Sequence, residues 1–196
     1  MKFIELFEAK NIGDLYHLVT LNSMKFIIEN NKLKFHMHYE PDEKYEYISL
    51  TRNKYMNNIN FVKGFKLFRL IIDGNKLSER YKIKPFSYST EEEPEYEERV
   101  ITSEIKDIFK YVKGVVIIIN KELQARQKTF KSKGIENLEE LKKYCSEKAH
   151  RESLYKYYTD IADILEYLEK KNIPLYVQNG NNISRDLKIL DNYLFV

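Results

Sequence analysis

The stretch GVVIIIN at 114–120 is the feature that most constrains the fold of this chain. Its core is a continuous run of valines and isoleucines, and β-branched side chains favour extended backbone. Its length suits a strand buried in a protein interior and falls far short of the roughly 20 apolar residues that cross a membrane. The stretch therefore predicts the most buried strand of a folded domain.

Five other stretches have the composition or the alternation of strands. They are LYHLVT at 15–20, YEYISLT at 45–51, FKLFRLII at 65–72, YEERVIT at 96–102 and PLYVQ at 174–178. In 45–51 the period of two places Tyr47, Ser49 and Thr51 on one face. The pair Asp73-Gly74 predicts a turn after the third of these strands.

Helices are expected between and after these strands. Thr20 or Asn22 can cap a helix through 23–31, and Ser103 can cap a short helix over 104–112. Residues 121–171 are predicted to be mainly helical, with helical apolar spacing in 154–171. The pattern predicts an α+β fold in one domain, residues 1–196, with a β-rich part (1–120), a helical part (121–171) and a final strand and tail (172–196).

Composition narrows the classes of protein. Hydrophobic residues make up 43% and charged residues 32%, which is typical of a globular domain. The net charge of +3 is too small to indicate nucleic-acid binding by itself. Cys145 is the single cysteine, and the charged N-terminus lacks an apolar signal segment, so we expect a reducing, cytoplasmic setting with no membrane contact. Abundant Lys, Asn and Ile suggest an AT-rich source such as a phage or a low-GC bacterium.

Three groups of side chains can carry chemistry. His17 ends a strand just before a helix, Ser49 and Thr51 share a strand face, and Glu95 and Glu97 share a face of the extended segment EYE. Each group also has an ordinary structural explanation: a core histidine, a solvent-facing strand and a solvated acidic loop.

The order and spacing of these groups resemble the three-part signature of ADP-ribosyltransferases of the H-Y-E branch. LYHLVTLNSMKFIIENNKL resembles the opening of DNA-targeting ADP-ribosyltransferase toxins and their phage relatives, and YISLTRN resembles a strand of small phage proteins with this fold. LIIDGNKLSERYKIKPF followed by EYEERV is similar to their downstream block. The resemblance covers roughly residues 15–120 and implies a split, mixed or antiparallel sheet with flanking helices.

The resemblance implies that NAD is the substrate and that Glu97 is catalytic. Cleavage of the nicotinamide–ribose bond develops positive charge on the ribose, which a fixed carboxylate stabilises. Glu95 is expected to orient the acceptor or to raise the pKa of its neighbour by repulsion. Ser49 and Thr51 are expected to buttress Glu97 and the nicotinamide ribose.

Four further residues are expected to bind NAD. In this family a strand-borne histidine holds a ribose hydroxyl, which assigns that contact to His17. Tyr16 or Tyr47 is expected to stack on the nicotinamide, and the sequence leaves this choice open. Arg52 is expected to pair with the pyrophosphate as a bidentate donor.

The leading hypothesis is an NAD-dependent ADP-ribosyltransferase that modifies a protein or nucleic acid, in the host cytoplasm if phage-encoded. An NAD glycohydrolase, with water as acceptor, is the closest variant. A non-catalytic binding module on the same fold stays open, because the strand reads Ser-Leu-Thr where the family has Ser-Thr-Ser. An RNA-cleaving enzyme using His17 and Glu97 ranks last.

Other features of the sequence are weaker evidence for a function. His36 and His38 have the spacing of two metal ligands on a strand, but no third ligand is evident, so we expect no metal. Lysines near Cys145 can lower its pKa, but no partner histidine has motif spacing. The basic segment 121–133 is expected to be a solvated helix face or a phosphate contact.

Overall fold

A computed structural model describes residues 11–34, 46–54, 66–86, 97–119, 153–179 and 182–186, together with 134, 140, 143 and 144. The strands are β1 (Asp14–Thr20), β2 (Lys32–Lys34), β3 (Ile48–Thr51), β4 (Lys66–Asp73), β5 (Ile83–Phe86), β6 (Glu97–Val100), β7 (Glu104–Lys106), β8 (Val112–Ile118), β9 (Leu175–Asn179) and β10 (Asn182–Ser184). The helices are α1 (Leu21–Asn30), α2 (Gly74–Ser78) and α5 (Ser153–Lys170), with a 3-10 turn, η1 (Ile108–Lys110).

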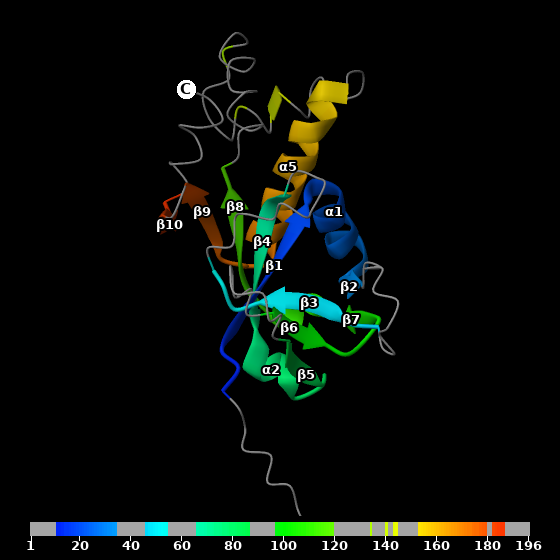
Figure 1. Ribbon diagram of the computed structural model, residues 1–196. Coiled ribbons are helices and arrows are strands. Elements are labelled where there is room, and N and C mark those ends of the chain that lie inside the picture. The colour runs from blue at the N-terminus through cyan, green and yellow to red at the C-terminus, as the bar shows by residue number, and fades with distance from the viewer. Residues whose placement is uncertain are drawn as a thin grey trace, which may run out of the picture.

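Eight of these strands form one sheet in the order β10-β9-β8-β4-β1-β3-β6-β5, and β2 pairs with β7 in a second, two-stranded sheet (Figure 1). All neighbouring strands are antiparallel except β8 and β9, which are parallel. The sheet is therefore mixed and mostly antiparallel. The α+β class predicted from the scattered strands is confirmed.

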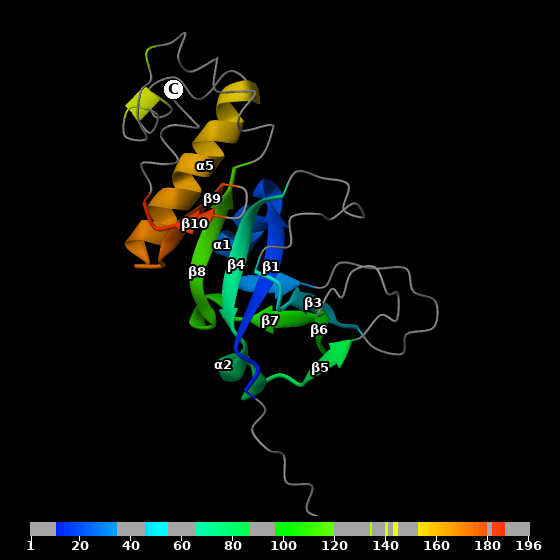
Figure 2. The same cartoon turned by 60° about the vertical axis from the view of Figure 1, so that its left-hand side comes forward.

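The interior lies between the large sheet and two helices. Val115, Val116 and Ile117 of β8 are at most 1% exposed, as the valine- and isoleucine-rich stretch predicts. α1 and α5 pack against each other and on the same face of the sheet (Figure 2), and Lys25 of α1 forms an ion pair of 2.6 Å with Asp160 of α5. We call this covered side the helix face.

Alternation along β1 separates two sets of side chains. Leu15 and Val19 are buried in the helix-face core. Tyr16 points to the opposite side and shares its register with Ile71 of β4. We call this second side, on β1 and on the strands paired with it, the Tyr16 face.

The first helix begins where the sequence predicts. Thr20 is the N-cap, because its hydroxyl accepts a hydrogen bond of 3.1 Å from the backbone N–H of Ser23, so the alternative cap at Asn22 is wrong. The helix ends at Asn31, whose φ of 51° is left-handed. Asp73 and Gly74 do more than turn the chain: Asp73 caps the short helix α2, accepting from the backbone N–H of Lys76 at 3.0 Å.

The helix predicted over 104–112 is wrong. Glu104–Lys106 is the strand β7, in which Ile105 pairs with Leu33 of β2 and is fully buried. Asp107 then takes a left-handed φ of 53°, and only the single turn η1 follows. Pairing with a strand 70 residues earlier in the chain outweighs the local helical pattern. In the predicted helical part, the helix α5 is confirmed, whereas residues 120–133 lie outside the described residues.

Candidate functional site

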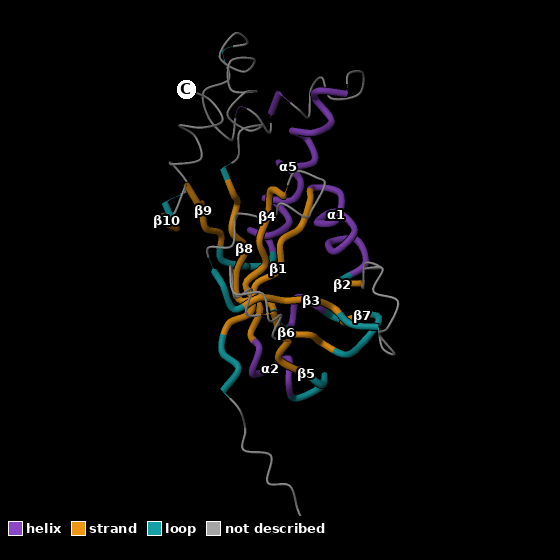
Figure 3. Tube along the Cα trace, viewed as in Figure 1, coloured by secondary structure: helices purple, strands orange, loops and turns teal. Residues whose placement is uncertain are grey.

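The three strands that carry the predicted motifs are neighbours. β1, β3 and β6 are successive strands in the sheet order, and β3 and β6 run across the foot of β1 (Figure 3). Thr51 of β3 pairs with both Tyr16 of β1 and Glu97 of β6. One row of paired residues therefore crosses all three motifs. Only the backbone of Glu97 is described, and Glu95 lies outside the described residues.

The hydroxyl-bearing side of β3 belongs to the Tyr16 face. Thr51 pairs with Tyr16, so the period of two places Ser49 and Tyr47 on the same side. The buried Ile48 and Leu50 occupy the helix face. Four of the predicted site residues thus share one side of the sheet: Tyr16, Tyr47, Ser49 and Thr51.

Arg99 is a cation on this side that the sequence interpretation missed. It pairs with Ser49, and its guanidinium carbon lies 4.0 Å from the centroid of the Tyr47 ring. Both side chains are only 6% exposed. The signal was present in the sequence, since Arg99 follows Glu97 by two positions in a predicted strand. Tyr47 is thus already covered by a cation, whereas Tyr16 is half-buried and more accessible.

His17 lies on the other side of β1 from Tyr16. Its Nδ1 donates a hydrogen bond of 3.0 Å to the backbone carbonyl of Ser49, which makes the imidazole a link between β1 and β3. Alternation groups it with Leu15 and Val19 of the helix face. The structure therefore does not bring His17 to the row that joins Tyr16, Thr51 and Glu97, and the ribose contact stays a prediction.

Arg52 is held by a carboxylate that the sequence interpretation did not use. Its Nε lies 2.6 Å from Oε1 of Glu98, whose side chain is 6% exposed. Glu98 pairs with the buried Leu50, so this ion pair belongs to the helix face. The charge of Arg52 is already balanced there, and its expected contact with pyrophosphate stays a prediction.

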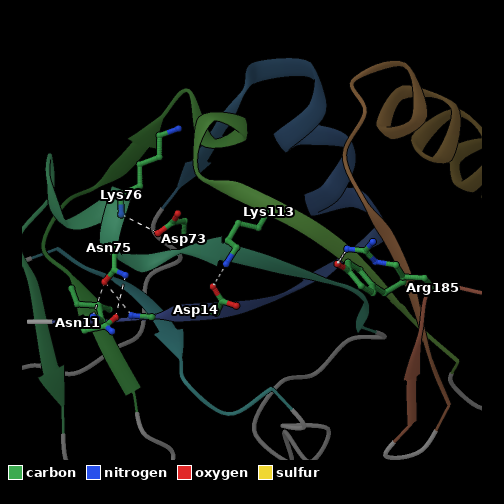
Figure 4. A network of polar contacts seen from close by, with 10 residues as sticks. Asn11, Asp14, Asp73, Asn75, Lys76, Lys113 and Arg185 are labelled. Carbon is green, nitrogen blue, oxygen red and sulfur yellow. Dashed lines mark hydrogen bonds and ion pairs between the residues drawn. The ribbon is translucent and has the colours of Figure 1, made fainter.

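Tyr16 is surrounded by charged groups from several segments. Burial raises the pKa of its phenol, and the negative charge of Asp14 raises it further, while Lys54, Arg69 and Lys113 act in the opposite direction. The phenol is therefore protonated at neutral pH and can donate a hydrogen bond. Lys113 forms an ion pair of 2.6 Å with Asp14 (Figure 4).

Arg69 is a fully buried cation on the Tyr16 face. Its Nη1 donates to the backbone carbonyl of Lys54 and, at 2.6 Å, to Oε1 of Gln178 in β9. Burial lowers the pKa of the guanidinium to about 10, which still leaves it charged at neutral pH. Arg69 thereby links the turn after β3 to strand β9. Within that turn, the backbone N–H of Asn53 donates to Thr51 Oγ1 at 3.0 Å.

Metal and membrane signals add nothing to this site. Among the described residues, no group of three His, Cys, Asp or Glu side chains is arranged to hold a metal ion. His36, His38 and Cys145 lie outside the described residues. No helix in the described part of the chain is long and apolar enough to cross a bilayer.

Comparison with known proteins identifies no relative. No protein-family model matches the chain, and neither a curated protein nor a solved structure matches it significantly. The fold and the contacts described above are therefore the basis for the functional proposal.

Proposed function

We propose that this protein is an NAD-dependent ADP-ribosyltransferase that modifies a protein or nucleic-acid acceptor, with phage–host conflict as its setting. One observation carries the proposal. The segments that resemble the family signature lie on three neighbouring strands, and Tyr16, Thr51 and Glu97 occupy one row across them. In the sequence these residues are 35 and 46 positions apart, and the sheet brings them into one row.

The described side chains suit a dinucleotide. NAD carries ribose hydroxyls, two phosphates and two bases, and the Tyr16 face offers hydroxyl groups from Ser49 and Thr51, the phenol of Tyr16 and nearby cations. Bound NAD supplies the ADP-ribosyl group, released as the nicotinamide–ribose bond breaks. In the proposal, the carboxylate of Glu97 stabilises the positive charge that develops on the ribose and accepts the proton of the incoming nucleophile.

His17 takes a different part in this proposal from the one its motif suggests. Its hydrogen bond to the Ser49 carbonyl fixes β3 against β1. That bond sets the position of the Ser49 and Thr51 hydroxyls relative to Tyr16. We assign His17 to positioning the strand, with the ribose contact as a separate prediction.

The decisive experiment follows label from NAD. Protein, NAD labelled in its adenylate part, and host-type lysate are incubated, and labelled macromolecules and free nicotinamide are measured. We expect Glu97→Ala to lower both by about 10²–10³-fold, the usual effect of removing a group that stabilises transition-state charge. Glu29→Ala, an exposed carboxylate on α1, is the matched control and should behave as the wild type. Equal labelling by the wild type and the Glu97 variant would refute the proposal.

A second candidate is a non-catalytic binding module on the same fold. The observation that favours it is the internal pairing of His17 with Ser49 and of Arg52 with Glu98, which engages two groups expected to contact NAD. Thermal unfolding with millimolar NAD separates the two candidates. A ligand at 100 times its Kd stabilises a protein by about 2.7 kcal/mol, so an unchanged melting temperature favours the module.

A further inference from the structure

Three cations from separate segments surround Tyr16. Lys54 follows β3, Arg69 lies in β4 and Lys113 lies in β8, and each lowers the pKa of the Tyr16 phenol. Asp14 is the carboxylate that acts on the same phenol. Asp73, the register partner of Asp14, acts on Lys113 and adds a second carboxylate, so these described groups sum to +1, three positive charges against two negative.

Contacts place the side chains of Lys113 and Arg69, and the backbone of Lys54, on the Tyr16 face. Asp14 and Tyr16 are two residues apart in β1, so they share a side, and Lys113 reaches that side through its ion pair with Asp14. Arg69 pairs with Leu18, again two residues from Tyr16. The guanidinium of Arg69 holds the carbonyl of Lys54, which brings the turn after β3 over this face.

An aromatic ring borders the cluster on β9. Ile71 of β4 pairs with Tyr16 of β1 on one edge and with Gly114 of β8 on the other. A Cβ added at Gly114 would lie 2.7 Å from the ring of Tyr176. The ring of Tyr176 therefore lies directly over Gly114. Arg185 donates to the Tyr176 hydroxyl at 2.9 Å and is exposed (Figure 4), which extends the positive charge along the sheet.

We propose that the Tyr16 face binds the pyrophosphate group of NAD, held by the ammonium groups of Lys54 and Lys113 and by the hydroxyl of Tyr16. Arg69 contributes its positive charge from below the surface, because it is fully buried and engaged with Lys54 and Gln178. This inference rests on the proposed function for the identity of the ligand. It also replaces Arg52 as the partner of the phosphates, because the ion pair of Arg52 with Glu98 lies on the opposite, helix face.

The chemistry of the cluster selects a phosphate anion. A protonated phenol and two ammonium groups can all donate hydrogen bonds, and the oxygens of an ionised phosphate accept them. Asp14 orients Lys113 without neutralising the whole cluster. Because Lys113 is 51% exposed, its attraction for an anion is expected to weaken with added salt.

The test measures binding, not turnover. The full chain is titrated with ADP-ribose, with inorganic pyrophosphate and with nicotinamide riboside, which has no phosphate. The Lys54→Gln/Lys113→Gln double variant removes two charges, and Lys110→Gln/Lys170→Gln, two exposed lysines in η1 and α5, is the charge-matched control. We expect ADP-ribose and pyrophosphate to bind at least about tenfold more weakly to the first variant. The control variant should bind them as the wild type does, and nicotinamide riboside should bind all three proteins alike.

Tyr16→Phe isolates the hydroxyl. It keeps the ring and is expected to weaken ADP-ribose binding about threefold to tenfold, the effect of one hydrogen bond. The proposal is overturned if ADP-ribose affinity is the same in the Lys54/Lys113 variant as in the wild type, or falls equally in the control. Binding of single-stranded oligonucleotides without any binding of ADP-ribose overturns it as well.

The outcomes also separate this subsite from the proposed activity. Lysine-dependent ADP-ribose binding in a protein that never transfers label supports the subsite and refutes the transferase. Label transfer that is unaffected by the Lys54/Lys113 variant refutes the subsite and leaves the transferase standing.

Discussion

The bond between Arg69 and Gln178 gives the sharpest test of how this sheet is held together. Arg69 is 0% and Gln178 is 1% exposed, and the guanidinium also holds the carbonyl of Lys54. The perturbation we consider is Arg69→Met, which preserves much of the side-chain volume and removes the charge and the donors. The paired perturbation is Gln178→Leu.

The free-energy cost of burying the Arg69 charge and the gain from its hydrogen bonds are of similar size. Burial lowers the pKa of Arg69 to about 10, and at about 1.36 kcal/mol per pKa unit the buried charge costs a few kcal/mol. Two hydrogen bonds from a charged donor return about 1.5–3 kcal/mol each. Arg69→Met removes all of these terms and takes a donor from the buried Oε1 of Gln178 and from the part-buried carbonyl of Lys54. A buried acceptor that loses its donor costs about 1–3 kcal/mol. We expect the variant to lose about 2–6 kcal/mol of unfolding free energy.

The double variant should be more stable than Arg69→Met alone. Gln178→Leu removes the buried acceptor that Arg69→Met deprives of its donor, so Arg69→Met/Gln178→Leu should lose only about 1–3 kcal/mol. Gln178→Leu by itself leaves the charged guanidinium short of an acceptor and should lose about 1.5–3 kcal/mol. The two changes are therefore strongly non-additive, as expected for residues in one network.

Urea unfolding of the four proteins, followed by circular dichroism, measures these differences. Arg185→Met is the control, because Arg185 is exposed and its described contacts are with the hydroxyl and the ring of Tyr176. It should change stability by less than about 1 kcal/mol. If the double variant loses the sum of the single losses within about 0.5 kcal/mol, the buried network does not exist as described.

Two further changes test other parts of the fold. Gly114→Ala places a methyl group 2.7 Å from the ring of Tyr176, so we expect a loss of about 1–3 kcal/mol in urea unfolding, and an unchanged stability would mean that the ring does not lie on β8. Burial and then two neighbouring carboxylates of α5 raise the pKa of Asp163, so its ionised form is unfavourable in the folded state. Asp163→Asn should therefore gain a few tenths of a kcal/mol at pH 7 and nothing below pH 3.8, the ordinary pKa of the group; a gain that persists in acid would contradict the electrostatic explanation.

Local pattern predicted those features whose causes are local. The valine- and isoleucine-rich stretch became the buried strand β8, and a threonine before an apolar helical segment became the cap of α1. The alternation in 45–51 correctly grouped Tyr47, Ser49 and Thr51 on one face. In each case the preference of a few adjacent residues agrees with the burial that the fold provides.

Features set by distant partners were not predicted. β7 forms because Ile105 pairs with Leu33, and the sequence around 104–112 contains no sign of that partner. The pairing of Arg52 with Glu98 arises because β3 and β6 are neighbours, which a motif read along the chain does not reveal. The position of His17 on the helix face, in contrast, could have been predicted from the sequence. Adjacent residues of a strand point to opposite sides, so His17 and Tyr16 must lie on different faces.

The residues of the predicted signature lie on both sides of the sheet, and their substitution has different consequences on each side. A change at His17 disturbs the bond to Ser49 and hence the position of β3, so lost activity in a His17 variant does not establish contact with NAD. Thr51 lies on the Tyr16 face, in the row shared with Tyr16 and Glu97, and a change there leaves the His17 bond intact. Under the proposed function, substitutions at Tyr16 and Thr51 report on ligand contact, whereas substitutions at His17 report on the support of β3. Experiments that compare the two faces separate an active transferase from a scaffold that has only retained its shape.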